Sequence, residues 1–240
     1  MKFTVCKNYD EMSDKAARIV NSAIKSYPEI TLGLATGSTP LGLYKRMIEA
    51  YNAGEISFKK VKSFNLDEYC GLTRDNSQSY YYFMRRNLFD HIDIDMNNVE
   101  VPNCEVSDYQ AECERYDKKI EENGGIDIQI LGIGNNGHIA FNEPEEALYA
   151  KTHHTPLTRS SIEANKRFFN SIDEVPTSAI TMGIESIMKA RKIIILISGV
   201  KKHAALTKLL SGRITTGCPA TILNCHPDCC VLADEEAYHG

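Results

Sequence analysis

A chain of 240 residues is long enough to bury a sizeable core, and a single α/β domain covering residues 1–240 is ordinary at this length. The formal net charge of −5 argues against nucleic acid or an anionic membrane as a partner, so any phosphate should be bound locally. No apolar run approaches the roughly 20 residues of a membrane span, and the first residues turn polar too early for a signal peptide, which predicts a cytoplasmic protein.

The first predicted elements alternate between strands and helices. A short strand is followed by a helix that Asp10 or Ser13 could cap. A compact apolar strand at 30–35, a helix at 41–50 and a third strand at 61–66 come next. Each strand is short and bounded by polar or breaking residues, as expected for a sheet whose strands are connected by helices.

The loop Thr36-Gly37-Ser38-Thr39-Pro40 joins the second strand to the next helix. With Pro40 at a first helical position, it predicts a helix N-terminus with free N–H groups, hydroxyl donors and the positive end of the dipole, which together suit a phosphate. It is not a Walker A loop, because no Gly-Lys-Ser/Thr follows. An ordinary capped loop between strand and helix is the alternative.

Asp67 and Glu68 follow the third strand directly. In an open parallel sheet, the loops after the carboxyl ends of the strands share one rim, where ligands bind. These acids are therefore candidates for chemistry, and solvated turn residues are the alternative. The aromatic run at 80–83 is predicted to serve packing.

The remaining elements continue the alternation. We predict helices at 80–89, 109–120 and 177–190, a central strand at 128–133, a strongly apolar strand at 193–197, a helix after Ser198-Gly199, and a short helix and strand at 220–223 and 229–233. This order predicts an α/β fold, a Rossmann-like three-layer sandwich with a mainly parallel sheet. Between about 145 and 175 the pattern is irregular, and we predict a lid segment there.

The sequence LGIGNNGHIAFNEP (131–144) places His138 and Glu143 directly after the central strand. A histidine titrates near neutral pH, and a nearby carboxylate can raise its basicity or fix its tautomer, so the pair is suited to acid–base catalysis. The glycines also match G-x-G-x-x-G, but Pro144 argues against the long helix that a dinucleotide site requires. A structural role for His138 is the other alternative.

The eight cysteines are scattered without a C-x-x-C pair, so we expect reduced thiols. Cys225-His226 with Cys229-Cys230 comes nearest to a metal signature. Zinc sites usually use two spaced pairs of ligands, and 229–232 is more typical of a buried strand in which cysteine is a small hydrophobic residue. We predict no bound metal.

Several motifs in order resemble the glucosamine/galactosamine-6-phosphate isomerase family, over nearly the whole chain. They are ATGSTP (35–40), FNLDEY (64–69), GIGNNGHIAFNEP (132–144), ANKRFF (164–169), AITMGIESIM (179–188), SGVKKHAAL (198–206) and PATIL (219–223). The resemblance implies a deaminase that converts glucosamine 6-phosphate and water to fructose 6-phosphate and ammonia. It implies no cofactor, because the carbonyl or iminium of the substrate itself accepts the electrons.

The resemblance also implies residue roles. Asp67 would take the proton from C2 and return one at C1, His138 would open the pyranose ring, and Glu143 and Asn136 would support that histidine. The residues implied to bind substrate are Thr36, Gly37, Ser38, Thr39, Gly134, Arg167 and Lys202.

Two departures limit what the resemblance implies. Enteric members have an acid at the position of Asn136, and an amide can orient His138 but cannot compensate its positive charge. Those members also bind an N-acetylated amino-sugar phosphate as an activator, just after the NEP motif. Here 145–154 begins with acids, which should repel phosphate. With the short segment after Asp234, this predicts a non-allosteric enzyme that is a monomer or small homo-oligomer.

Three other functions stay open. A galactosamine-6-phosphate deaminase or isomerase needs the same catalytic groups, and a 6-phosphogluconolactonase has a related fold, although FNLDEY and GHIAFNE argue against it. A sugar-phosphate-binding regulator without turnover would not need both Asp67 and His138.

Overall fold

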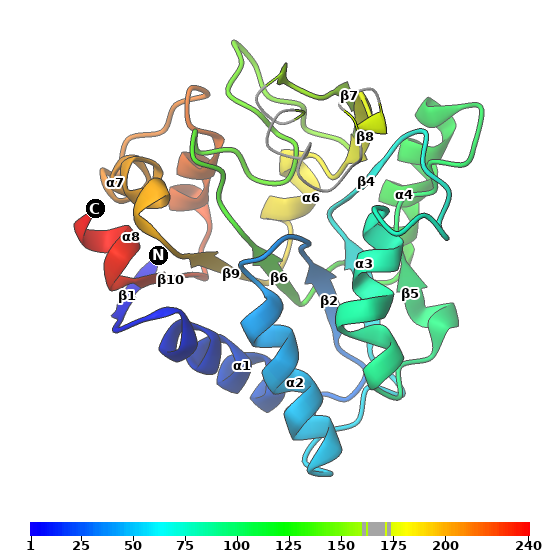
Figure 1. Cartoon of the computed structure of the whole chain (residues 1–240), viewed down its shortest axis with the longest axis horizontal. Coiled ribbons are helices and arrows are strands. Elements are labelled where there is room, and N and C mark those ends of the chain that lie inside the picture. Colours follow the sequence, from blue (N-terminus) through cyan, green and yellow to red (C-terminus); the bar gives the residue numbers. More distant parts are fainter. Residues whose placement is uncertain (160–161, 163–170, 172–173) are drawn as a thin grey trace.

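The computed structural model describes residues 1–159, 162, 171 and 174–240. Its centre is a sheet in the order β1-β10-β9-β6-β2-β3-β5, in which every neighbouring pair is parallel (Figure 1). The strands are β1 (Lys2–Cys6), β2 (Thr31–Leu34), β3 (Lys62–Asn65), β5 (Val99–Glu100), β6 (Ile128–Leu131), β9 (Lys192–Ile197) and β10 (Cys229–Asp234). The predicted α/β fold with a mainly parallel sheet is confirmed.

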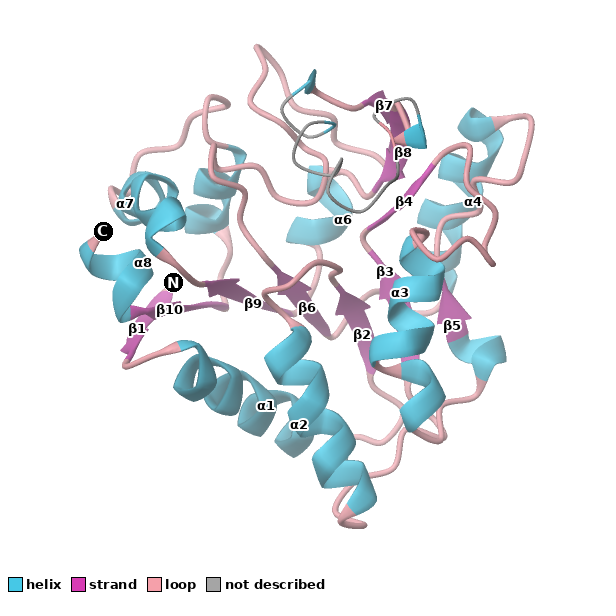
Figure 2. Cartoon of the chain, viewed as in Figure 1, coloured by secondary structure: helices cyan, strands magenta, loops and turns pink. Residues whose placement is uncertain are grey.

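Helices cover both faces of the sheet and complete the three layers (Figure 2). One face carries α1 (Tyr9–Ser26), α2 (Leu41–Asn52) and α3 (Tyr80–Asn87). The other carries α4 (Tyr109–Glu122), α6 (Ile184–Met188), α7 (His203–Leu210) and α8 (Glu235–His239). Short 3-10 helices are η1 (Phe89–His91), η2 (Met96–Asn98), η5 (Val200–Lys202) and η6 (Pro219–Cys225).

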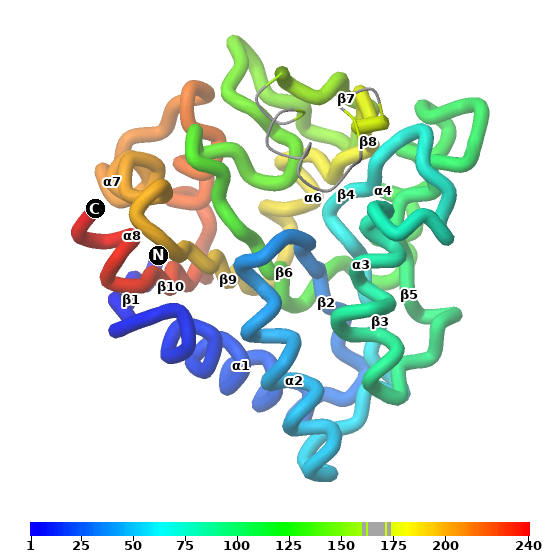
Figure 3. The backbone as a smooth tube through the Cα atoms, viewed as in Figure 1, coloured from blue at the N-terminus to red at the C-terminus, as the bar shows by residue number. Residues whose placement is uncertain are grey.

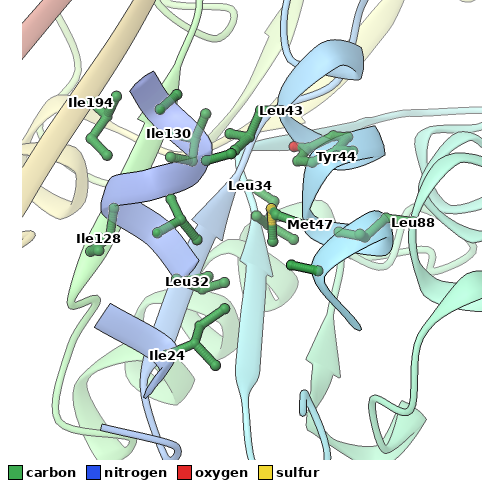
Figure 4. Close-up of a cluster of buried hydrophobic side chains, with 14 of the residues drawn as sticks. Ile24, Leu32, Leu34, Leu43, Tyr44, Met47, Leu88, Ile128, Ile130 and Ile194 are labelled. Atoms are coloured by element: carbon green, nitrogen blue, oxygen red, sulfur yellow. The ribbon is translucent and has the colours of Figure 1, made fainter. Parts of the chain in front are cut away.

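The side chains of β9 alternate between two hydrophobic cores. Ile194 and Leu196 pack in the core beneath α1 and α2. Figure 4 shows part of this core, with Ile194 among its side chains. Ile193, Ile195 and Ile197 pack in the core beneath α6 and α7. Because a parallel strand covered on both faces has no polar side, it reads as a continuous apolar run, as 193–197 does.

A second, antiparallel sheet of β4 (Asp67–Tyr69), β8 (Ser178–Thr181) and β7 (His153–Pro156) was not predicted. The helix predicted over 177–190 is therefore wrong in its first part, and only α6 is helical. The apolar pair Ala179 and Ile180 fits a helical spacing with later residues, but both are fully buried in the central strand of this small sheet. Pairing on both sides overrides the local pattern.

Helix ends also differ from prediction in detail. Asn8, rather than Asp10 or Ser13, caps α1, and its side chain accepts a hydrogen bond from the N–H of Glu11. The helix predicted at 220–223 is present as the 3-10 helix η6. Helix α8 was not predicted from the sequence. The two chain ends lie near each other, and the rings of Phe3 and Tyr238 are 5.7 Å apart (Figure 3).

The strands β9, β6, β2 and β3 are adjacent, so the loops after them share one rim. From β2 the chain continues to its neighbour β3, whereas from β6 it goes on to β9 on the opposite side. This divergence between β2 and β6 is a topological switch point, where open α/β sheets bind ligands. The predicted phosphate loop follows β2, and the loop with His138 follows β6.

The predicted lid at about 145–175 includes β7 in the small sheet, and part of it lies outside the described residues. No helix of the described ranges is both long and apolar enough to cross a membrane.

Candidate active site

The loop after β2 has the features of an anion site. Gly37 has φ +90°, in the left-handed region that favours glycine. Pro40 is the N-cap of α2 rather than its first residue, and it supplies no side-chain cap. The first turn of α2 has no acid, so the positive end of its dipole is unopposed. With Ser38 exposed and Thr36 and Thr39 half-buried, the loop can receive a phosphate.

Lys202 ends η5 on the same rim, after β9. Its side chain is half-buried, and this burial lowers the pKa of the ammonium group. Among the described residues, the ammonium group of Lys202 has no ion-pair or hydrogen-bond partner, so its charge is available to an anion; only its backbone N–H is bonded, to the carbonyl of Gly199. Arg167, the other predicted cation, lies outside the described residues.

Asp67 and Glu68 are both buried, so the alternative that they are solvated turn residues is excluded. Asp67 is 6% exposed, and burial, with a smaller contribution from Glu68, raises the pKa of its carboxyl to about 8. The Glu68 carboxylate accepts hydrogen bonds from the N–H groups of Tyr80 and Tyr81, both at 2.8 Å. Glu68 thus holds the start of α3, whereas no described residue hydrogen-bonds the carboxylate of Asp67, which remains available for chemistry.

The contacts of Tyr80 with the candidate site were not predicted, because the aromatic run at 80–83 was expected to serve packing alone. Its hydroxyl donates to the hydroxyl of Tyr69 at 2.9 Å, and its ring stacks on Phe141 of the loop that carries His138. Burial raises the pKa of Tyr80, nearby Tyr69 and Asp67 raise it further, and Thr36 opposes them. The ring and hydroxyl of Tyr80 therefore connect Tyr69 of β4 with the loop that carries His138. In the sequence, the signal that could have indicated these contacts was the aromatic run that directly follows the capping residue Ser79.

His138, Glu143 and Asn136 come together in the loop after β6. Nδ1 of His138 lies 3.0 Å from Oε1 of Glu143, which is within hydrogen-bonding distance. The angle between the two groups does not meet the geometry of a hydrogen bond. Asn136 donates from Nδ2 to Oε2 of Glu143 at 2.7 Å and accepts from the N–H of His138 at 3.1 Å. The predicted cluster of three side chains is therefore present.

Glycines give this loop its shape. Gly134 donates its N–H to the carbonyl of His138 and accepts from the N–H of Gly137, closing a tight turn. Gly137 has φ +92°, and a Cβ there would lie 2.2 Å from Sγ of Cys218. Its carbonyl accepts from the N–H of Ala220, which ties the loop to η6. The turn thus requires glycine for packing as well as for its backbone angles.

Thr181 joins the segments that carry Asp67 and His138. It lies opposite Asp67 in the pairing of β4 with β8, and its hydroxyl accepts a hydrogen bond from the N–H of Phe141 at 3.1 Å. The carbonyl of Met182 accepts from the side chain of Asn142 at 2.9 Å, and its N–H donates to Leu66. The end of β8 therefore holds the Asp67 strand and the His138 loop together.

The possible zinc ligands have other roles. His226 is buried, and its two ring nitrogens contact the carbonyl of Ala190 at 2.7 Å and the N–H of Asp228 at 3.1 Å. Cys229 and Cys230 lie in β10. Within the described part of the chain, no group of three or more His, Cys, Asp or Glu residues could hold a metal ion. All eight cysteines are free thiols.

The family model of glucosamine-6-phosphate isomerases and 6-phosphogluconolactonases matches residues 7–231 of this chain. The chain belongs to this family. Among curated members, glucosamine-6-phosphate deaminase of Thermoanaerobacter pseudethanolicus is 55% identical over 237 residues, covering 99% of this chain and 94% of that protein. The Clostridium perfringens deaminase is also 55% identical, covering 99% and 98%.

Solved structures of the glucosamine-6-phosphate isomerase and 6-phosphogluconolactonase family share the fold. One, a monomeric glucosamine-6-phosphate deaminase, superposes with a TM-score of 0.97 at 44% identity, covering 100% of this chain and 99% of that one. The 6-phosphogluconolactonase of Trypanosoma cruzi has a TM-score of 0.80 at 20% identity, covering 100% and 96%. That second likeness shows the fold alone.

Proposed function

We propose that this chain converts glucosamine 6-phosphate and water to fructose 6-phosphate and ammonia. The observation that carries the proposal is the placement of three parts on neighbouring strand ends. These are the helix N-terminus after β2, the buried carboxylate of Asp67, and the His138–Glu143 pair after β6. The 55% identical deaminases support the same activity.

In this proposal His138 opens the pyranose ring. Ring opening needs a proton taken from the C1 hydroxyl and one given to the ring oxygen, which suits a histidine that can hold either protonation state. Glu143, 3.0 Å from Nδ1, would stabilise the ring while it is positively charged. Asn136 would hold Glu143 by its 2.7 Å hydrogen bond and would add no second negative charge.

Asp67 is the proposed base that moves hydrogen between C2 and C1. Its pKa of about 8 means that the carboxyl of the free protein is largely protonated at pH 7. The amine of the substrate is attached to C2, and its positive charge next to the carboxylate would lower that pKa. Substrate would therefore generate the base that acts on it, and one carboxylate could reach both adjacent carbons.

The phosphate is proposed to bind Gly37, Ser38, Thr39 and the ammonium of Lys202, with Thr36 and Gly134 lining the sugar. Binding energy from this remote group can orient the sugar at the reacting end. Arg167 is proposed as a further phosphate ligand on the sequence pattern alone.

The cellular setting is proposed in the same way. Eight free cysteines suit the reducing cytoplasm. The 44% identical structure of a monomeric deaminase supports a monomer. The acids that begin 145–154 support the absence of activation by an N-acetylated sugar phosphate.

The test is ammonia and ketose-phosphate release by the purified protein from glucosamine 6-phosphate or, separately, galactosamine 6-phosphate. We expect turnover of the first sugar, unchanged by added N-acetylglucosamine 6-phosphate. Turnover of galactosamine 6-phosphate alone would show that the substrate is the C4 epimer of the proposed sugar. No ammonia from either sugar would refute a deaminase, and hydrolysis of 6-phosphogluconolactone would then be measured.

A further inference from the structure

Tyr9, the first residue of α1, links two helices to the proposed phosphate loop. Its hydroxyl donates a hydrogen bond to the carbonyl of Ser38 at 3.1 Å and accepts one from the N–H of Gly42 at 2.7 Å. Gly42 lies in the first turn of α2, whose N–H groups have no partners within the helix. Because Pro40 supplies no side-chain cap, a tyrosine from another helix performs that function.

The contact fixes the direction of one peptide group. The Ser38–Thr39 peptide is trans, as are all peptides in the described part of the chain. In a trans peptide the C=O and N–H point to opposite sides. With the carbonyl of Ser38 held on the side of α1, the N–H of Thr39 must point to the other side of the loop, away from α1.

Little else holds this peptide in place. The other donor to the carbonyl of Ser38 is the N–H of Leu41, at 3.4 Å. A rotation of this peptide changes ψ of Ser38 and φ of Thr39, and the hydrogen bonds from Tyr9 and Leu41 to the Ser38 carbonyl oppose it. The rotation would turn a carbonyl dipole, instead of an N–H, toward a bound anion.

We propose that Tyr9 is a positioning residue that keeps the Ser38–Thr39 peptide in the phosphate-binding orientation. The proposal rests on the assignment of this loop to the substrate phosphate. Tyr9 does not touch the reacting atoms, so its loss should weaken binding of the phosphate end without slowing the chemical step.

The size of the effect is limited by water. Tyr9, Ser38 and Thr39 line a cavity of about 670 Å³ between α1 and α2, so a water molecule can reach the carbonyl when the hydroxyl is removed. A hydrogen bond of this kind contributes about 0.5–1.5 kcal/mol, which corresponds to roughly a threefold to tenfold change in affinity.

The experiment compares the wild type with Tyr9→Phe in two assays. The first is KM and kcat for glucosamine 6-phosphate, and the second is the dissociation constant of inorganic phosphate by calorimetry. Both assays are carried out at a temperature well below the melting temperature of each variant. We expect KM and the phosphate dissociation constant to rise about threefold to tenfold, with kcat within about twofold. The control is Tyr27→Phe, because Tyr27 is exposed at the far end of α1.

Two results would overturn the proposal. One is unchanged phosphate binding in Tyr9→Phe, even if the protein melts at a lower temperature, because the role would then be only structural. The other is a fall in kcat with KM unchanged. If the wild type releases no ammonia, the proposed function fails instead, and phosphate calorimetry still tests Tyr9.

Discussion

Gly134 lies against the imidazole of His138: a Cβ placed on Gly134 would come within 2.4 Å of ring carbon Cε1. No real Cβ sits at such a distance, so either the ring or the turn would have to move. The requirement for glycine here comes from the imidazole of His138, the proposed acid–base residue, since Gly134 has no positive φ.

Gly134→Ala should therefore displace the ring of His138 from Glu143 and lower kcat by about 10- to 100-fold, as a misplacement near 1 Å can. Gly132→Ala is the matched control in the same loop, because a Cβ on Gly132 would have no atom within 4 Å. Ammonia release by the two variants is the measurement. Similar rates in both would show that the position of His138 does not depend on Gly134.

Asp67→Asn should abolish ammonia release while inorganic phosphate binds within about twofold of the wild type. The amide keeps the size of the side chain but cannot accept a proton from C2. Rates and phosphate calorimetry on the same preparation separate the two effects. Equal loss of turnover and phosphate binding would contradict the assignment of Asp67 as the base.

The raised pKa of Asp67 also predicts how stability depends on pH. The folded protein binds this proton with a pKa of about 8, against 3.8 for an ordinary aspartate, so this group contributes stability that is fully present below about pH 4 and is lost as the pH rises toward 8. From pH 5 to pH 9, the melting temperature of the wild type should fall relative to Asp67→Asn, on the order of 10 °C.

Asp228→Asn is the control for that measurement. Lys192 lowers the pKa of Asp228, so the stability from this ion pair is lost only in acid. Its difference from the wild type should stay constant between pH 5 and pH 9. A pH-independent difference for Asp67→Asn as well would mean that Asp67 is ionised in the folded protein at neutral pH.

Lys202→Met should raise KM for glucosamine 6-phosphate by about 10- to 100-fold, because a charged hydrogen bond to phosphate contributes about 1.5–3 kcal/mol. The effect on kcat should be smaller. Lys201→Met removes an equal charge from the exposed neighbouring residue and should change KM by less than about twofold. Equal effects of both changes would indicate general attraction by charge in place of a defined contact.

Local patterns predicted much of this fold. The apolar run at 193–197 became β9, and the breaks after apolar strands marked the loops that carry Ser38 and His138. Glycine and proline restrict the backbone within a few residues, so a turn can be read from the sequence directly. The contact between His138 and Glu143 could also be predicted from local sequence, since both residues lie in one short loop.

The small sheet could not be predicted in this way. The segment 177–181 fits a helix as well as a strand, and its partners β4 and β7 are distant in sequence. Tyr80 was assigned to packing for a related reason, because its contacts with Tyr69 and Phe141 depend on how α3 packs. Such contacts are decided by tertiary pairing, which outweighs local preference.

By itself, the sequence determined the chemical groups and the loops that bear them, because strand ends, glycine turns and helix starts are set by neighbouring residues. Only the tertiary structure decided that these loops follow adjacent strands, that Thr181 connects Asp67 to the loop of His138, and that Tyr9 holds the carbonyl of Ser38. The reason is physical: strand order and helix packing depend on burying both faces of the sheet at once, which no single segment encodes.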